Sequence, residues 1–289
     1  MKYYQLAADG DQRLVARADE RAYDLTSANS ELTTFLDLLR ASDIGGQTVD
    51  ELTRGLVDES EPVSDESLRE RIEMPLSPDE VWAAGVTYKI SEEAREEESG
   101  MADVYLEVYN SERPELFFKA TESRTVGPHE PVGIRGDSDW NVPEPELAIV
   151  LYHGEVAGFT VGNDMSSRSI EGANPLYLPQ AKVYDRCCAI GPCVVSRAAI
   201  DDPHDLGISM EIVRDDEVVY HDSTRTDQMV RDCQELADYY VRHNEVPRLA
   251  VVLTGTSLVP SSEFTLTPRD TVTIQIEGIG SLTNPVTVV

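Results

Sequence analysis

Three carboxylates of the sequence have a spacing that could bind a cation. Glu144 and Glu146 are separated by a single proline, and Asp164 follows further along the chain. Alternate residues of a β-strand point to the same face, so Glu144 and Glu146 can converge on one ion. Three carboxylates without an imidazole suit a hard cation such as Mg²⁺ or Mn²⁺, with water in its other positions. The sequence therefore predicts a metal site at these three residues.

The composition supplies the alternative interpretation. The chain has 289 residues, with 54 Asp plus Glu, 24 Lys plus Arg and a formal net charge of −30. At this frequency about ten acid-x-acid pairs occur by chance, so the spacing alone also fits a solvated acidic face. The context favours the metal site, because Glu144 and Glu146 begin a hairpin pattern whose return strand ends at Asp164.

Lysine is scarce and two lysines lie among apolar residues. The chain has 4 lysines, at positions 2, 89, 119 and 182, against 20 arginines. Lys119 follows Leu116-Phe117-Phe118, and Lys182 follows residues 178–181. A desolvated ammonium can lose its proton and act as an acid or base, whereas a guanidinium stays charged. Both lysines are candidates for such chemistry, and a structural ion pair is the alternative for each.

Other familiar catalytic patterns are missing from the sequence. The five histidines are dispersed, and there is no His-Glu-x-x-His, phosphate loop or dinucleotide fingerprint. The four cysteines, at positions 187, 188, 193 and 233, include no Cys-x-x-Cys. We expect free thiols and a cytoplasmic protein.

The net charge excludes several classes of partner. A surface this acidic repels DNA, RNA and anionic membranes, and no apolar run reaches membrane-spanning length. An excess of acids with few lysines fits a protein that stays hydrated in molar salt, where screening removes self-repulsion. We therefore expect a halophilic protein, with an acidic protein of an ordinary cytosol as the alternative.

The elements that must position these residues are mostly strands. The pattern predicts one hairpin from strands 146–152 and 156–161, and a second from strands 208–214 and 218–220. Later strands are expected at 250–254, 271–277 and 286–289, and a helix at 228–243. Strands paired through hairpins, with grouped helices, indicate an α+β fold with a β-rich catalytic domain.

The first part of the chain has the pattern of a small separate unit. Strands are expected at 3–8, 13–18 and 22–25, a helix over 32–39 capped at Asn29-Ser30, and a second helix over 49–56. An acidic stretch and two prolines follow, so we place the boundary near Met74. The prediction is a small N-terminal α+β domain, residues 1–74, and a catalytic domain, residues 75–289. The sequence shows no role for Asp137 or for the glutamate-rich stretch 91–99.

From about Val81 to Ser257 the sequence resembles the fumarylacetoacetate hydrolase family, in motifs that occur in the family's order. The matching segments are Gly85-Val86-Thr87-Tyr88, Lys119, Glu144-Pro145-Glu146-Leu147, the stretch from Gly158 to Arg168 with its Asn163-Asp164-Met165-Ser166-Ser167-Arg168, the stretch from Lys182 to Pro192, and Leu253-Thr254-Gly255-Thr256. The resemblance implies a mixed β-roll core, a divalent metal, Mg²⁺ or Mn²⁺, bound by Glu144, Glu146 and Asp164, and a 2-oxo acid substrate chelated to it. It also implies a homodimer or homotetramer.

Two further segments favour one branch of this family. Arg113 to Lys119 and Arg135 to Glu146 are similar to the archaeal 2-keto-3-deoxy-pentonate dehydratases. Hydrolytic and decarboxylating members carry a histidine shortly after the tyrosine of the opening loop, whereas Lys89-Ile90-Ser91-Glu92-Glu93 follows Tyr88 here. The resemblance therefore implies dehydration of a 2-keto-3-deoxy sugar acid, xylonate or arabinonate, to 2,5-dioxopentanoate in oxidative pentose catabolism.

The resemblance and the required chemistry together assign expected roles. A base must take a proton from C3 and an acid must help the C4 hydroxyl leave, for which Lys182 is the first candidate and Glu115 the second. We expect Lys119 to hold the substrate's charge, and Ser166, Arg168 and Thr256 to orient the substrate. The alternative for Arg168 is a salt bridge.

Two other functions remain open on the sequence. The first is an acylpyruvate-type hydrolase or oxaloacetate decarboxylase that uses the same metal site. The second is a non-catalytic halophilic binding module, which the ordered motifs disfavour.

Overall fold

The computed structural model describes residues 1–8, 10–88 and 107–289. The glutamate-rich stretch 91–99 and the segment after Tyr88 lie outside these residues. The first part of the chain, here called the N-terminal unit, consists of β1 (Lys2–Ala8), β2 (Asp11–Ala18), β3 (Arg21–Asp24), α1 (Leu25–Ala28), α2 (Phe35–Gly45), α3 (Val49–Leu56), η1 (Val57–Glu59), β4 (Glu61–Val63), α4 (Asp65–Arg71) and β5 (Ile72–Glu73).

The rest of the chain, here called the main body, is rich in strands. It consists of β6 (Glu80–Gly85), β7 (Glu115–Ala120), η2 (Glu122–Arg124), β8 (Thr125–Val126), β9 (Val132–Ile134), β10 (Asn141–Val142), β11 (Pro145–Tyr152), β12 (Glu155–Asp164), β13 (Ser166–Ser167), α7 (Arg168–Ala173), η3 (Pro175–Tyr177), α8 (Leu178–Lys182), β14 (Cys188–Ser196), η4 (Arg197–Ala199), β15 (Gly207–Arg214), β16 (Glu217–Arg225), η5 (Thr226–Gln228), α9 (Cys233–Val241), β17 (Leu249–Leu253), β18 (Asp270–Ile276) and β19 (Gly280–Val288). The prediction of a β-rich α+β fold is confirmed.

The largest sheet of the described residues has 12 strands and runs through both parts of the molecule. Its main order is β4-β3-β2-β1-β14-β12-β11-β17-β6-β7. Strand β11 lies in the middle and its side chains are buried on both faces, which explains its continuous apolar run Leu147 to Leu151. Strands β17 and β6 pair in parallel, whereas β11 and β12 form the antiparallel hairpin expected from the sequence. The sheet is therefore mixed.

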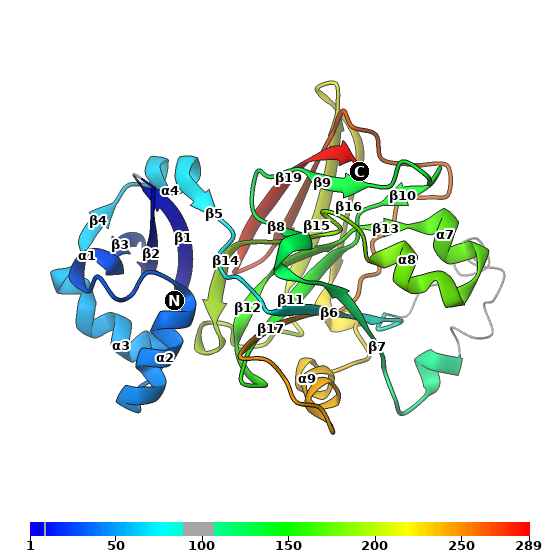
Figure 1. Cartoon of the computed structure of the whole chain (residues 1–289). Coiled ribbons are helices and arrows are strands. Elements are labelled where there is room, and N and C mark those ends of the chain that lie inside the picture. Colours follow the sequence, from blue (N-terminus) through cyan, green and yellow to red (C-terminus); the bar gives the residue numbers. More distant parts are fainter. Residues whose placement is uncertain (9, 89–106) are drawn as a thin grey trace.

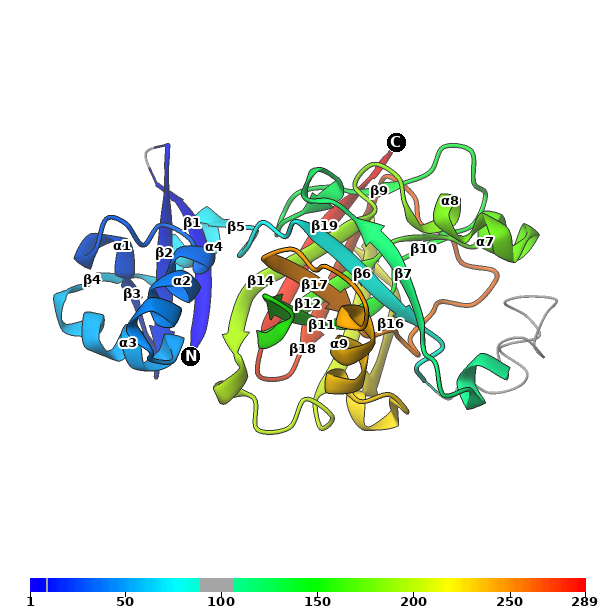
Figure 2. The same cartoon turned by 60° about the horizontal axis from the view of Figure 1, so that its bottom comes forward.

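The N-terminal unit lies to one side of the main body and joins it through β1 (Figures 1 and 2). Strand β1 pairs with β2 along its full length, and at Lys2 and Tyr3 it also pairs with β14. The chain crosses to the main body over residues 74–79. The division into domains 1–74 and 75–289 stays a prediction, because one sheet spans this boundary.

The main body also contains a second large sheet, β16-β15-β18-β19-β9, and a two-stranded sheet of β10 and β13. It contains the predicted hairpin of β15 and β16 around Asp215-Asp216, with β16 continuing to Arg225. Helix α9 packs its buried face, including Leu236 and Tyr240, into the core. The short helices α7 and α8 lie at the opposite end from the N-terminal unit (Figure 1).

The helix starts expected from the sequence were wrong in two places. Helix α2 is capped by Thr34, whose hydroxyl accepts from the Asp37 amide while Asp37 accepts from the Thr34 amide; Asn29-Ser30 is not the cap. Helix α9 begins at Cys233 behind the cap Asp232, after a separate 3₁₀ turn at 226–228. In both cases a later polar residue satisfies the free amides better.

Two further findings concern the whole described chain. All four cysteines are free and buried. Among the described residues, the helices are too short or too polar to cross a bilayer.

Candidate active site

The hairpin of β11 and β12 brings the three predicted carboxylates together. The register pairs Glu146 with Gly162, and the Asp164 amide donates to the Glu144 carbonyl oxygen at 2.9 Å. Carboxylate oxygens of Glu144, Glu146 and Asp164 all lie within 4.8 Å of one another, and all three residues are buried. The alternative of a solvated acidic face is therefore wrong for these residues.

Cationic side chains form ion pairs with this carboxylate cluster and offset part of its negative charge. Lys182 Nζ lies 2.8 Å from Glu144 Oε2 and 3.2 Å from Asp164 Oδ2, and Arg168 Nη2 lies 3.1 Å from Glu144 Oε1. Burial would raise the pKa of Glu144, but Lys182 and Arg168 outweigh it and lower the pKa to about 2. Within the described part of the chain Glu146 forms no ion pair. Burial, then the charges of Asp164 and Glu144, raise its pKa well above the ordinary value, and the smaller opposing effects of Lys182 and the Gly255 amide do not offset this.

This arrangement fits a hard divalent cation. The donor set is made only of carboxylate oxygens, as Mg²⁺ prefers. Glu144 Oε1 and Asp164 Oδ1 are buried and accept no hydrogen bond from the described residues, although each faces a cationic side chain. Buried carboxylate oxygens normally have such partners. A bound cation would occupy these lone pairs and relieve the mutual repulsion that raises the pKa of Glu146.

Lys182 lies at the end of α8 and lines the cavity above the carboxylates. Its ammonium also sits 5.6 Å from the centre of the Phe117 ring. Burial would lower the pKa of Lys182, but Asp164 and Glu144 raise it well above its usual value. The group predicted for proton transfer is thus in contact with the proposed metal ligands.

Lys119 occupies a different place from the one expected. It is fully buried, and its ammonium contacts the carbonyl oxygens of Met165 at 2.8 Å and Lys182 at 2.5 Å, and Asp164 Oδ1 at 2.5 Å. The two carbonyl oxygens accept hydrogen bonds from the ammonium, and Asp164 Oδ1 forms an ion pair with it. The geometry gives Lys119 a positioning role beneath the carboxylates, which differs from the expected contact with substrate.

The cavity above the carboxylates has a volume of about 70 Å³. Glu115 lines it from the first position of β7, and Thr256 from the loop after β17. Burial raises the pKa of Glu115, which keeps a proton on its carboxyl group to a higher pH than usual. Arg168 also lines the cavity, and its ion pair with Glu144 realises the alternative proposed for it.

Ser166 is not among the described residues that line this cavity. Its hydroxyl carries one proton, which it can donate to the Asp164 carbonyl oxygen at 3.1 Å or to Glu144, where a hydrogen bond helps to lower the pKa of the carboxyl group. We therefore place Ser166 behind the carboxylates, where it braces them.

Three further residues of the candidate site were given no role on the sequence, although two of them, Tyr88 and Gly255, lie in the matching segments. The Gly255 amide donates to Glu146 Oε2 at 2.6 Å, and its φ of +86° requires glycine. Tyr88 is buried in the cavity wall, and its hydroxyl has no hydrogen-bond partner among the described residues. Glu171 lines the same cavity from α7. The turn Thr254-Gly255-Thr256, which lies in a matching segment, could have indicated Gly255, but acids are too common in this sequence to single out Glu171.

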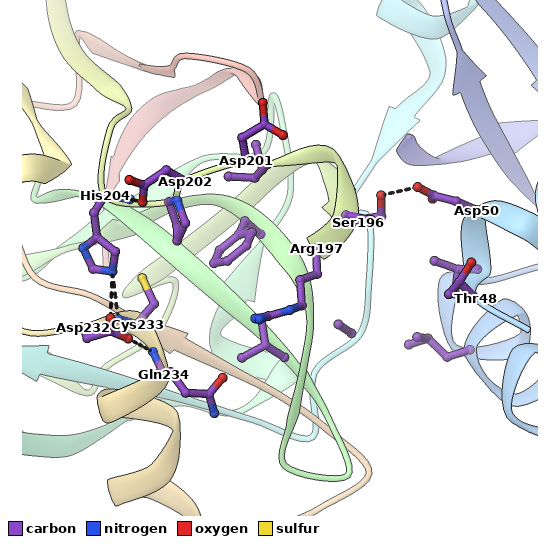
Figure 3. A pocket seen from close by; sticks show the side chains of 18 residues that line it. Thr48, Asp50, Ser196, Arg197, Asp201, Asp202, His204, Asp232, Cys233 and Gln234 are labelled. Carbon is purple, nitrogen blue, oxygen red and sulfur yellow. Dashed lines mark hydrogen bonds and ion pairs between the residues drawn. The ribbon is translucent and has the colours of Figure 1, made fainter.

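A much larger cavity, of about 790 Å³, lies between the N-terminal unit and the main body (Figure 3). Several of its polar groups are paired with protein neighbours: Ser196 Oγ donates to Asp50 Oδ2 at 2.9 Å, and His204 Nε2 accepts from the Cys233 amide at 3.2 Å. Among the described residues, its acids form no metal-binding group. Size therefore does not identify the active site in this molecule.

Comparisons with known proteins agree with the geometry. The model of the fumarylacetoacetate hydrolase C-terminal family matches residues 80–287. The chain is 58% identical over 289 residues to a probable 2-keto-3-deoxyxylonate dehydratase of Haloferax volcanii, covering 100% of both chains. It is 42% identical over 221 residues to the 2-dehydro-3-deoxy-D-arabinonate dehydratase of Saccharolobus solfataricus, covering 75% of this chain and 74% of the relative.

A solved structure extends the likeness to the whole fold. The 2-keto-3-deoxy-D-arabinonate dehydratase complexed with magnesium and 2,5-dioxopentanoate matches with a TM-score of 0.84 and 33% identity, covering 100% of this chain and 99% of that chain. The family model spans the hairpin with its three carboxylates, both buried lysines and the Gly255 turn. The protein belongs to the fumarylacetoacetate hydrolase family.

Proposed function

We propose that this protein is a divalent-metal-dependent hydro-lyase. Its substrate would be a 2-keto-3-deoxy-pentonate, xylonate or arabinonate, and its product 2,5-dioxopentanoate. The observation that carries the proposal is that Lys182 and Glu115 line the same cavity as the carboxylate cluster. The names of the two relatives and the magnesium-bound structure support the substrate class.

Glu144, Glu146 and Asp164 would hold Mg²⁺, and Mn²⁺ has the same preference for oxygen ligands. When bound, the cation would supply Lewis acidity that makes the C3 protons of a 2-oxo acid easier to remove. Lys119, Ser166 and the Gly255 amide keep the carboxylates in place. Arg168 and Thr256 line the cavity at positions from which they can orient the substrate.

Lys182 and Glu115 would divide the two proton transfers. One takes a proton from C3, and the other protonates the C4 hydroxyl as it leaves as water. The resulting C3–C4 double bond then moves to C4–C5 by proton transfer, and the enol at C5 tautomerises to the aldehyde. The sum is the loss of one water from the sugar acid, with no oxidant or reductant.

Hydrolysis on the same site is the less favoured function. Hydrolytic members of the family use a histidine shortly after the tyrosine of the opening loop, and Lys89 to Glu93 contain none. The structure supplies carboxyl and ammonium groups around the cavity, which suit proton transfer to and from a sugar acid.

The test is to incubate the protein in molar KCl with Mg²⁺ and either 2-keto-3-deoxyxylonate or 2-keto-3-deoxyarabinonate. We expect 2,5-dioxopentanoate, followed by NMR, with loss of turnover when EDTA is added. An acylpyruvate and oxaloacetate serve as comparison substrates. Turnover of these two without turnover of either pentonate would favour the hydrolase or decarboxylase and reject the dehydratase.

A further inference from the structure

Glu171 is a half-buried acid in the cavity wall that the proposed reaction does not use. It lies on α7, and its side chain is only 14% exposed. Its Oε2 accepts no hydrogen bond from the described residues, and Arg168 Nη1 lies 3.6 Å away. An oxygen buried in this way keeps lone pairs for a donor that enters the cavity.

The Arg168 guanidinium fixes where Glu171 lies relative to the carboxylate cluster. Its Nη2 contacts Glu144 Oε1 at 3.1 Å, and its Nη1 faces Glu171. Glu171 is therefore separated from a metal ligand by the width of one guanidinium. A 2-oxo acid held at the carboxylate cluster by its first two carbons would extend its remaining carbons into the cavity that Glu171 also lines.

The charges lining the cavity are unbalanced. Glu115, Glu144, Glu146, Asp164 and Glu171 face it, against the cations Arg168 and Lys182. Raised pKa values favour protons on Glu115 and Glu146, Lys119 contacts Asp164, and Lys182 and Arg168 contact Glu144. Glu171 is left with Arg168 Nη1 at 3.6 Å. A second anionic group on the substrate would be repelled by the Glu171 carboxylate at low dielectric.

We propose that Glu171 determines which tail the substrate may carry. It accepts a hydrogen bond from a hydroxyl at the C4–C5 end of a sugar acid, and it excludes 2-oxo acids that end in a second carboxylate. The inference rests on the proposed binding of a 2-oxo acid at the carboxylate cluster, and it selects hydroxylated acids over dicarboxylates such as oxaloacetate.

The test uses three five-carbon 2-oxo acids that differ only in their tail. These are 5-hydroxy-2-oxopentanoate, 2-oxopentanoate and 2-oxoglutarate, none of which has a C4 hydroxyl to eliminate. Their binding to the Mg²⁺-loaded protein is measured by calorimetry, so turnover is not required. For the wild type we expect the hydroxyl tail to bind best, the methyl tail next and the carboxylate tail worst.

Two substitutions separate the hydroxyl and charge effects. Glu171→Gln should tighten binding of 2-oxoglutarate by about tenfold or more relative to 2-oxopentanoate. Glu171→Met should abolish the advantage of the hydroxyl tail over the methyl tail. Glu217→Gln, on the exposed strand β16, removes one remote negative charge and should leave all three affinities within about twofold.

Several outcomes would overturn the inference. The first is equal binding of 2-oxoglutarate and 2-oxopentanoate by the wild type. The second is a ratio of these two affinities that does not change in Glu171→Gln. A loss of Mn²⁺ affinity in Glu171→Gln, without a change in that ratio, would show that Glu171 only supports Arg168 and Glu144. Turnover of pentonates with unchanged ratios rejects this inference alone, whereas no binding of any 2-oxo acid rejects the proposed function with it.

Discussion

The small cavity at the carboxylate cluster and the large cavity beside the N-terminal unit both contain acidic and cationic side chains, but in different surroundings. In the large cavity (Figure 3), Asp50 accepts from Ser196, His204 accepts from the Cys233 amide, and Asp201 and Arg197 are exposed. In the small cavity, five carboxylates are confined with two cations, and buried oxygens remain without hydrogen bonds from the described residues. In a protein with 54 acids, the candidate active site is therefore identified by buried carboxylates that repel one another, and the volume of a cavity does not identify it.

Removing one carboxylate from each cavity should show the largest difference between the two cavities. We expect Glu146→Gln to abolish metal binding and to reduce turnover by about 10³-fold or more, because one of three ligands is lost. Asp201→Asn, in the large cavity, should leave turnover within about twofold. Mn²⁺ binding and the dehydration assay measure both variants. Full turnover of Glu146→Gln would reject the metal site.

A buried lysine should matter to stability far more than a partly exposed one. Lys119→Met removes one of the two ammonium groups that contact Asp164 and leaves two carbonyl oxygens without this donor, so we expect the free energy of unfolding to fall by about 3–5 kcal/mol. Lys2→Met removes a single bond to the Ile279 carbonyl oxygen and should cost about 1 kcal/mol. Urea unfolding at constant KCl compares them. Equal losses would contradict the positioning role of Lys119.

Glu115→Gln should separate catalysis from stability. We expect kcat to fall by about 10²-fold, since a group that transfers a proton is lost. Burial raises the pKa of Glu115, so the folded protein holds this proton more tightly than the unfolded chain does. Its contribution to stability is therefore present below the ordinary pKa of the group and is lost as pH rises through the raised value.

Glu115→Gln should also change how the free energy of unfolding depends on pH. Because glutamine removes the cost of a buried charge, the variant should be more stable than the wild type near pH 7, by about 1 kcal/mol. At acidic pH the difference in the free energy of unfolding between the two proteins should disappear. Thermal unfolding of the metal-free proteins across this pH range is the measurement, and a variant less stable at every pH would contradict it.

The smallest effect is expected when the exposed arginine of the large cavity is replaced. Arg197→Ala should change turnover, metal affinity and the free energy of unfolding by little, within about 0.5 kcal/mol for the last. A large loss of turnover would mean that the cavity between the N-terminal unit and the main body takes part in the reaction.

The sequence predicted what depends on local pattern. Strand alternation and a hairpin turn were enough to bring Glu144, Glu146 and Asp164 together. The pairing of β1 with β14, and of β17 with β6, joins segments far apart in the chain, and no local pattern reports such pairing. The role of Lys119 was inaccessible for the same reason, because its acceptors at residues 164, 165 and 182 are assigned only by the fold.

The hairpin of β11 and β12 and the parallel pair of β17 and β6 also differ in the length of chain they enclose. Closing a short loop costs little chain entropy, whereas parallel pairing of distant segments costs more and is slow. The three carboxylates thus belong to a segment that can form early. Gly255 and Thr256, which complete the cavity, must wait for β17 to join β6. A cation present during folding would therefore meet its ligands before there is a cavity to admit the substrate.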